Sequence, residues 1–234
     1  MSTYQALVLG CSGAIGEAWL AYFQSDPDCH RAVGLSRSGT PAFDLENETS
    51  MAECAAFLIS ENGSQPTGHF AWIIDATGAL TINGLGPEKR LDALNSQQLL
   101  KQFEINAVGP ALLIKHFSPL LAIHERAVYA TLSARVGSIE DNHKGGWYGY
   151  RAAKAARNML LQTAAIELSR KRRLAVFAAL QPGTVASPLS APFASADHTI
   201  TPEASVTQMM AALKELPATG RAHFVDYAGL SIPW

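Results

Sequence analysis

Hydrophobic residues along the chain follow two alternating patterns. Short apolar runs bounded by turn residues are typical of strands, and longer stretches with apolar positions three or four residues apart are typical of helices. The runs that we interpret as strands are 5–9, 32–35, 70–76, 127–132, 174–180 and 223–226, with a short further piece at 42–43. The stretches that we interpret as helices are 13–24, 51–59, 96–121, 150–168 and 202–216, with a kink or break at Pro110.

The order of these elements predicts the fold class. Strands that alternate with helices form βαβ units, which build a mostly parallel sheet covered on both faces. The nearly continuous apolar runs 71–74 and 175–180 suit strands that are buried on both sides. Apart from a turn cluster at 61–68, we find no linker, repeat or low-complexity segment. We therefore predict one α/β domain over 1–234, a doubly wound parallel sheet flanked by helices.

A glycine-rich turn joins the first strand to the first helix. It contains Gly10, Gly13 and Gly16. Glycine permits a tight turn, lets the backbone approach a pyrophosphate and lets the helix pack closely on the strand, while the helix N-terminus offers free N–H groups to the phosphates. A glycine pattern alone is weak, but its place between strand and helix indicates a Rossmann-type dinucleotide site.

The end of the second strand favours NADP over NAD. Sites that prefer NAD place an acid there to hold the ribose hydroxyls. This sequence has none at 34–38, and Arg37 could instead face the 2′-phosphate of NADP. The competing interpretation is a solvated loop charge, and the preceding glycine turn favours the phosphate role.

Two further segments are candidates for the cofactor site. Asp44 could accept a hydrogen bond from the adenine amino group, or it could cap the next turn. Ala76, Thr77 and Gly78 end the 70–76 strand, where small residues would let the cofactor pass close to the backbone. A simple strand-to-loop turn would look the same.

The segment 145–154 carries the candidate chemistry. Tyr150 and Lys154 are four residues apart on a predicted helix, so both side chains share one face. A nearby ammonium favours a phenolate and lowers the tyrosine pKa from about 10 towards the working pH. Tyr150 would then be a usable general acid or base.

These motifs together resemble the short-chain dehydrogenase/reductase family. The resemblance covers almost the whole chain in order, from the glycine turn through 75–78, Asn106, the 133–138 region, Tyr150 and Lys154 to 182–185. The stretches 132–139, 145–148 and 232–234 are similar to a branch that includes C-factor-like proteins and small carbonyl reductases.

The resemblance implies a role for each matching residue. Tyr150 would exchange the proton of the substrate hydroxyl, and Lys154 would lower its pKa and bond the nicotinamide ribose. Asn106 would hold a water that links Lys154 to solvent, although a polar residue at a helix break would look the same. The implied catalytic residues are Ser133, Tyr150, Lys154 and Asn106. The candidate cofactor-binding residues are Gly10, Ser12, Gly13, Ile15, Gly16, Arg37, Asp44, Leu45, Ala76, Thr77, Gly78, Tyr150, Lys154, Pro182, Gly183 and Val185.

Two positions depart from the family pattern. The glycine turn has two residues in each interval, where the family usually has three and then one. Counting back three residues from Gly137, as the family's serine requires, gives Ala134. The adjacent Ser133 is our first candidate for the oxyanion donor and Ser138 the second, because a donor aimed at the developing negative charge stabilises the transition state.

Composition narrows the partners. The chain has 234 residues, a net charge of -2 and no long run of one sign, so it shows no footprint for nucleic acid or an acidic membrane surface. Three cysteines and scattered histidines give no metal-ligand spacing. With no leader or membrane-spanning run, we expect a cytoplasmic protein. The family resemblance and the apolar helices 96–121 and 150–168 predict a homodimer or homotetramer.

Two functions follow from these residues. The first is hydride transfer between NADP(H) and a carbonyl or alcohol substrate, with 187–201 as a mobile substrate lid. The second is a cofactor-binding regulatory or signalling protein, which Ala134 favours. The intact pair of Tyr150 and Lys154 favours the enzyme. The sequence names neither the substrate nor the physiological direction.

Overall fold

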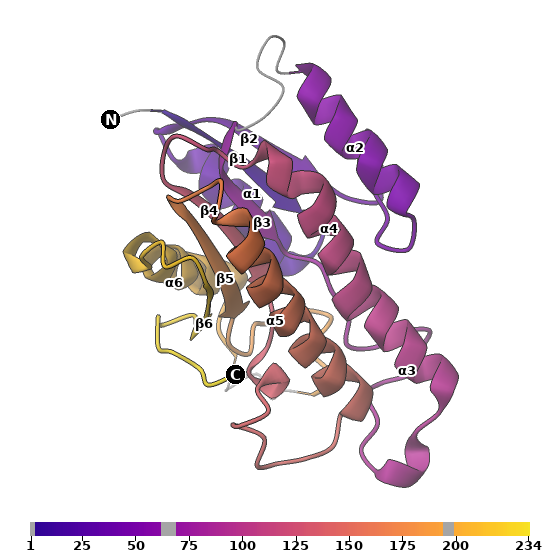
Figure 1. Cartoon of the computed structure of the whole chain (residues 1–234). Helices are drawn as coiled ribbons and strands as arrows, with labels where there is room; N and C mark the ends of the chain where they lie inside the picture. Colours follow the sequence, from indigo (N-terminus) through magenta and orange to yellow (C-terminus); the bar gives the residue numbers. More distant parts are fainter. Residues whose placement is uncertain (1–2, 62–68, 194–198) are drawn as a thin grey trace.

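A single six-stranded parallel sheet organises the chain. The computed structural model describes residues 3–61, 69–193 and 199–234. The strands lie in the order β2-β1-β3-β4-β5-β6, and every neighbouring pair is parallel (Figure 1). Their bounds are β1 Tyr4–Leu9, β2 Cys29–Leu35, β3 Phe70–Asp75, β4 Ala127–Leu132, β5 Ala175–Gln181 and β6 Ala222–Asp226. The predicted α/β fold with a parallel sheet is confirmed.

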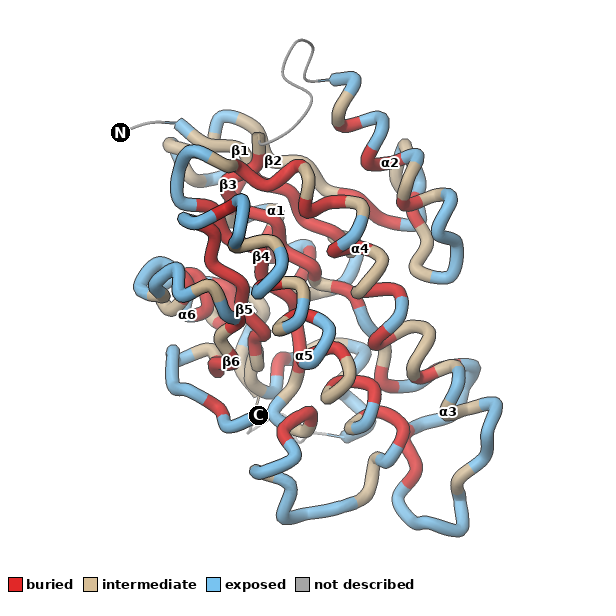
Figure 2. Tube along the Cα trace, viewed as in Figure 1, coloured by how far each residue is buried: buried red, intermediate tan, exposed pale blue. Residues whose placement is uncertain are grey.

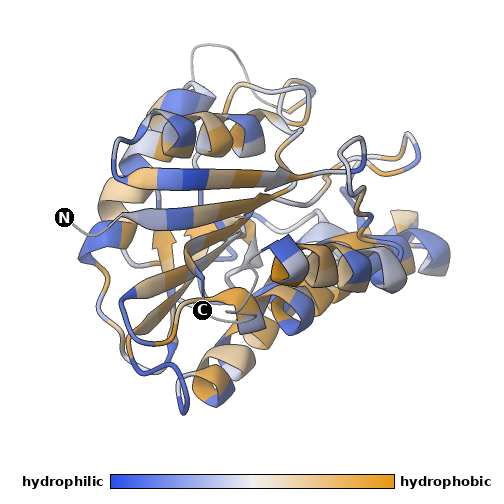
Figure 3. Cartoon of the chain, turned by 90° about the horizontal axis from the view of Figure 1, so that it is seen from above, coloured by the Kyte–Doolittle hydropathy of each residue, from blue (hydrophilic) through white to orange (hydrophobic). Residues whose placement is uncertain are grey.

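Helices cover both faces of this sheet. Their bounds are α1 Ala14–Ser25, α2 Glu48–Glu61, α3 Ser96–Phe103, α4 Gly109–Phe117, α5 Tyr148–Leu168 and α6 Pro202–Glu215. One hydrophobic core joins α1 and α6 to one face, and a second joins α2, α4 and α5 to the other. The sheet lies between the two helical layers when it is seen from above (Figure 3). Among the described residues, no helix is long and apolar enough to cross a membrane.

The alternation of side chains divides the strands between the two cores. Successive residues of a strand point to opposite faces, so Ile73 belongs to one core while its neighbours Trp72 and Ile74 belong to the other. Both β3 and β4 are buried along their whole length, and these strands run through the middle of the molecule in Figure 2. This burial explains why their sequences are almost continuously apolar.

The strand order places a crevice at the carboxyl ends of β1 and β3. From β1 the chain moves outward to β2, and it then returns to add β3 on the other side of β1. A ligand crevice forms where the order reverses in this way, because the two connections leave on opposite faces of the sheet. The glycine turn after β1 and residues 75–78 after β3 therefore meet at one edge.

The predicted strand at 42–43 is not formed. Phe43 is buried, and its N–H donates to the carbonyl of Ser36, while Asp44 forms an isolated antiparallel bridge with Asn47. Pro41 precedes this piece and has no N–H to donate to a ladder. The segment is therefore a folded connection between β2 and α2.

The predicted helix 96–121 is divided. Between α3 and α4 lies one π-helical segment, Glu104–Val108, and a short 3-10 turn, Ser118–Leu120, follows α4. Pro110 stands in the first turn of α4 and cannot donate an N–H to the carbonyl of Asn106, four residues earlier. The predicted break is confirmed, and it takes the form of a wide turn in one continuous rod (Figure 1).

Candidate active site

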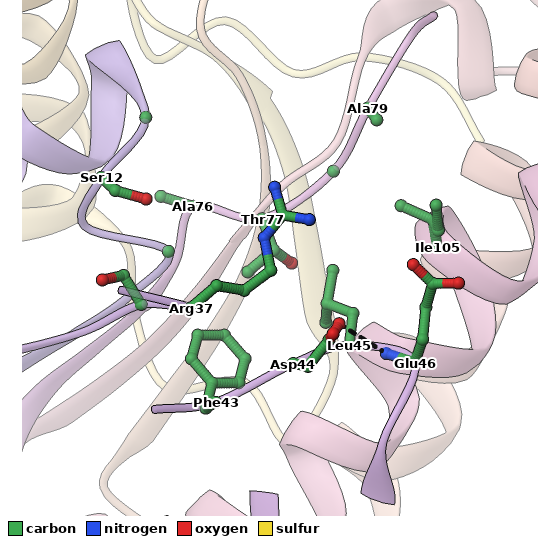
Figure 4. Close-up of a pocket in the computed structure, with 14 residues that line it drawn as sticks. Ser12, Arg37, Phe43, Asp44, Leu45, Glu46, Ala76, Thr77, Ala79 and Ile105 are labelled. Carbon is green, nitrogen blue, oxygen red and sulfur yellow. Dashed lines mark hydrogen bonds between the residues drawn. The ribbon is translucent and has the colours of Figure 1, made fainter. Parts of the chain in front are cut away.

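The crevice after β1 and β3 continues along the loop after β2. Figure 4 shows Ser12, Arg37, Asp44 and Thr77 around it, from four separate segments. The first helix begins at this crevice with Gly13 as its N-cap, and no side chain caps it. The N–H groups of that first turn are thus available to an anion, as a dinucleotide pyrophosphate requires.

The glycine turn closes tightly despite its unusual spacing. Gly10 has φ of +85°, a conformation that favours glycine. A Cβ on Gly16 would lie 2.1 Å from the carbonyl oxygen of Gly10, so a larger residue would displace the backbone. Gly13 donates its N–H to that same carbonyl. The two-and-two spacing therefore still forms the close strand-to-helix packing that a dinucleotide site needs.

The residues after β2 line the outer end of the crevice. Arg37 is exposed and extends across the opening, as Figure 4 shows. Asp44 accepts a hydrogen bond from the N–H of Glu46 at 3.1 Å, so it caps the next turn, which was one of its two predicted roles. Leu45 also lines the crevice and packs against Gly109. Glu46, which our sequence analysis did not name, lies beside them and pairs with Lys101.

Gly78 lies where the crevice meets α5. Its φ is +137°, and a Cβ there would lie 2.9 Å from Asn106 Oδ1 and 3.3 Å from Lys154 Nζ. The turn after β3 thus brings backbone, amide and ammonium together without a side chain between them. Any larger residue at this position would displace the side chain of Asn106 or of Lys154.

Asn106 is fully buried in the π-helical segment. Its side chain accepts a hydrogen bond from the N–H of Ala79 at 3.1 Å and donates to the Ala79 carbonyl at 2.8 Å. A further donation goes to Gln102. Asn106 therefore fixes the loop after Gly78, and the missing N–H of Pro110 leaves its own carbonyl without the usual helical donor.

A buried ion pair lies under this junction. Arg157 and Asp75 are almost completely inaccessible, and Arg157 donates to the carboxylate, to the hydroxyl of Thr131 and to the carbonyl of Thr77. Asp75 also accepts from the N–H and hydroxyl of Thr77 and from the hydroxyl of Thr131. This network connects β3, β4, α5 and the loop after β3 that contains Thr77 and Gly78.

Tyr150 and Lys154 lie on the first turns of α5, and both are buried. Lys154 Nζ is 5.6 Å from the centre of the Tyr150 ring and donates to the Leu132 carbonyl at 2.9 Å. Burial raises the pKa of Tyr150 to about 12, opposed by the charge of Arg157. Burial also lowers the pKa of Lys154 well below its usual value. The predicted lowering of the Tyr150 pKa is therefore wrong here, because the loss of hydration on burial outweighs the opposing charge of Arg157.

The two candidate serines lie in different surroundings. Ser133 lines the cavities that contain Tyr150, and its buried hydroxyl donates to Asn158 Oδ1 at 2.6 Å. Ser138 lines a different cavity, accepts from the N–H of Asp141 and donates to the Trp234 carbonyl. Of the two serines, only Ser133 is placed beside Tyr150.

A larger cavity of about 610 Å³ adjoins Tyr150 and extends to Ile15 at the start of α1. Residues 182–185 after β5 form one wall, where Gly183 has φ of +81° and Val185 is buried. Trp147 and Phe193 lie across it with ring centres 5.4 Å apart. Part of the predicted lid, 194–198, lies outside the described residues.

The chain matches the family described as short chain dehydrogenase over residues 5–198. It is 31% identical over 194 residues to 1-hydroxy-2-glutathionyl-2-methyl-3-butene dehydrogenase of Rhodococcus sp., covering 83% of this chain and 79% of that protein. It is also 31% identical over 136 residues to C-signal of Myxococcus xanthus, covering 58% of this chain and 78% of that protein. The chain therefore belongs to the short-chain dehydrogenase family.

Solved structures share the fold. A carbonyl reductase from chicken fatty liver, described as NADPH-bound, superposes with a TM-score of 0.85 at 19% identity and covers the whole of both chains. At this identity the likeness establishes the backbone arrangement alone. The parallel sheet and its flanking helices are thus arranged as in that structure.

The buried pair of Asp75 and Arg157 gives the first prediction. Arg157→Met leaves a buried carboxylate without its cation, and we expect it to lower the free energy of unfolding by about 3 kcal/mol or more. Asp75→Asn combined with Arg157→Met should cost less than the sum of the two single changes. Urea denaturation of the four proteins measures this, with the exposed Arg173→Met as control. Additive losses would show that the two side chains do not stabilise each other.

Proposed function

We propose that this protein is an NADPH-dependent carbonyl reductase. The observation that carries the proposal is that Tyr150 and Lys154 share one cavity with Gly78, which also lines the dinucleotide crevice, while Tyr150 lines the larger cavity as well. A hydride donor in the crevice and a carbonyl in the cavity would meet beside the Tyr150 hydroxyl. The bound nicotinamide would supply the hydride, and the protein would supply position and the proton.

The residues around the crevice suit NADP(H). The uncapped first turn of α1 would hold the pyrophosphate, and the glycine turn leaves space for it. Arg37 would pair with the 2′-phosphate, since no carboxylate stands at the end of β2 to repel it. Lys154 would bond the nicotinamide ribose, and residues 182–185 would lie beside the ring.

Substitution of Arg37 tests the cofactor preference. We expect Arg37→Asp to weaken NADPH binding by about tenfold or more and to leave NADH binding unchanged or improved, because the new carboxylate repels a 2′-phosphate. Fluorescence titration of both cofactors against wild type and variant measures this, with Arg90→Asp as an exposed control outside the crevice. Tighter binding of NADH than NADPH by the wild type would contradict the preference.

The raised pKa of Tyr150 determines how the rate of each direction depends on pH. A phenol with a pKa of about 12 keeps its proton at neutral pH, so it donates to a forming alkoxide more readily than it accepts from an alcohol. The carbonyl of Asn106 has no donor from Pro110, which lacks an N–H, so it would hold a water that links Lys154 to solvent.

Steady-state rates with a panel of aldehydes and ketones test this function. We expect NADPH oxidation that is nearly independent of pH between about 6 and 9, and alcohol oxidation that rises about tenfold per pH unit over that range. Tyr150→Phe should abolish both reactions and leave NADPH binding intact. A protein that binds NADPH but turns over no carbonyl compound would instead support the second candidate, a regulatory or signalling protein, which Ala134 favours.

Ser133 is proposed as the oxyanion donor, because it shares both cavities with Tyr150. Its hydroxyl would have to exchange Asn158 for the substrate oxygen. We expect Ser133→Ala to lower kcat by about a hundredfold with NADPH binding unchanged. Ser138→Ala is the matched control and should have little effect. Full activity in Ser133→Ala would leave Tyr150 as the sole side-chain donor to the oxygen.

Assembly and lid are the remaining parts of the proposal. We propose a homodimer or homotetramer, supported by apolar side chains that α5 leaves exposed: Met159, Leu160 and Ile166.

Residues 187–193 form turns over the cavity that contains Tyr150, and Ser190 bonds back to the carbonyl of Val185. This segment would be the described part of a substrate lid.

A further inference from the structure

The charged side chains that line the cavity beside Tyr150 are all positive. Arg135, Lys144 and Arg151 contribute to its wall, and no aspartate or glutamate does so in the described part of the chain. The whole chain has a net charge of -2, so this wall departs from the average of the protein. Such a one-sign lining attracts a ligand group of opposite charge.

The three cations differ in how far they are already paired. Arg135 lies 3.3 Å from a carboxylate oxygen of Asp141 and 3.4 Å from one of Asp226, which offset its charge. Among the described residues, Lys144 and Arg151 form no ion pair within 4 Å, and Asp141, which pairs with Arg135, acts on Arg151 only through its more distant charge. These two side chains are therefore the ones available to a ligand.

The guanidinium of Arg151 is held in place by backbone. It donates to the carbonyls of Gly146 at 2.9 Å, Gly145 at 3.1 Å and Val136 at 3.4 Å. A guanidinium has five N–H donors, so two remain for another acceptor. A cation that is already fixed loses little freedom when it binds an anion.

A strained loop places an aromatic ring in the same cavity. Trp147 has φ of +55°, and Gly145 and Gly146 before it also have positive φ. A bulky residue rarely adopts this conformation, and such strain gathers at ligand sites. The buried Glu88 maintains the bend, because its carbonyl accepts from the N–H of Trp147 and its carboxylate from that of Gly149.

The position of the Trp147 ring completes the cavity. Its centre lies 6.1 Å from the Tyr150 ring and 5.4 Å from the Phe193 ring, edge to face in both cases. An apolar or aromatic ligand body could pack against this pair while a polar end reaches the cations. The carbonyl to be reduced would then face Tyr150.

We propose that the preferred substrates carry a carboxylate in addition to the reacting carbonyl, with Arg151 and Lys144 binding the carboxylate and Trp147 and Phe193 covering the body between the two groups. This inference rests on the proposed carbonyl reductase function. It assigns a specificity role to residues that take no part in proton or hydride transfer.

A matched pair of ketones tests the inference by binding. 4-Acetylbenzoate and its methyl ester differ in one negative charge, and neither can be reduced by NADP⁺. We expect 4-acetylbenzoate to bind the NADP⁺-loaded protein about tenfold or more tightly than the ester, as measured by calorimetry, with a difference that shrinks as salt is raised. Equal binding of the two compounds, or binding of neither, would overturn the inference.

Variants assign the effect to the two cations. Lys144→Gln combined with Arg151→Gln should bring the two affinities within about twofold, and Arg151→Lys should keep part of the difference. Lys171→Gln, beyond the far end of α5, is the control. If the substitutions only distorted the loop, they would weaken the binding of both compounds by the same factor and leave the preference for 4-acetylbenzoate unchanged. A double variant that keeps this preference would therefore overturn the assignment to Lys144 and Arg151.

Turnover separates this inference from the proposed function. With NADPH, 4-acetylbenzoate should show the higher kcat/KM of the two ketones. Reduction of both with equal kcat/KM would contradict the substrate class and leave the reductase intact. Selective binding of 4-acetylbenzoate without reduction of either would contradict the reductase and leave the carboxylate site intact.

Discussion

The ion pair between Asp75 and Arg157 is the interaction on which the site depends. A carboxylate in the middle of a sheet is costly unless every oxygen is paired, and here Thr77, Thr131 and Arg157 supply the donors. Because these donors come from three segments, satisfying one charge fixes the loop after β3, the neighbouring strand β4 and helix α5 together. Gly78 lies next to Arg157 and Lys154, so the same ion pair also supports the point where the loop after β3 approaches α5.

Much of the fold could be predicted because burial leaves a direct trace in the sequence. The strands β3 and β4 are buried on both faces and are almost wholly apolar, so their type and approximate bounds were predicted correctly. The strand predicted at 42–43 was wrong because Phe43 is buried in a turn rather than in a strand. Its side chain packs into the core while its N–H donates to the Ser36 carbonyl. Two apolar residues are too few to distinguish a strand from a buried turn.

The candidate site was predicted less completely, since its polar residues depend on contacts distant in sequence. The spacing of Tyr150 and Lys154 was sufficient to place them on one face of a helix. Arg157 lies one turn further and would read as a solvated charge, because nothing local shows that Asp75 stands opposite. The direction of the Tyr150 pKa was mistaken for the same reason: burial cannot be weighed against charge until the packing is known.

The wide turn between α3 and α4 determines how the rod faces its neighbours. A π-helical turn accommodates one residue more than an α-helical turn, and one residue corresponds to about 100° of rotation. The faces of α3 and α4 are therefore out of phase, so α3 packs mainly on α5 while α4 also reaches α2 and β3. Loss of one residue within 104–108 would rotate one half of the rod against the other and withdraw Asn106 from its hydrogen bonds to Ala79.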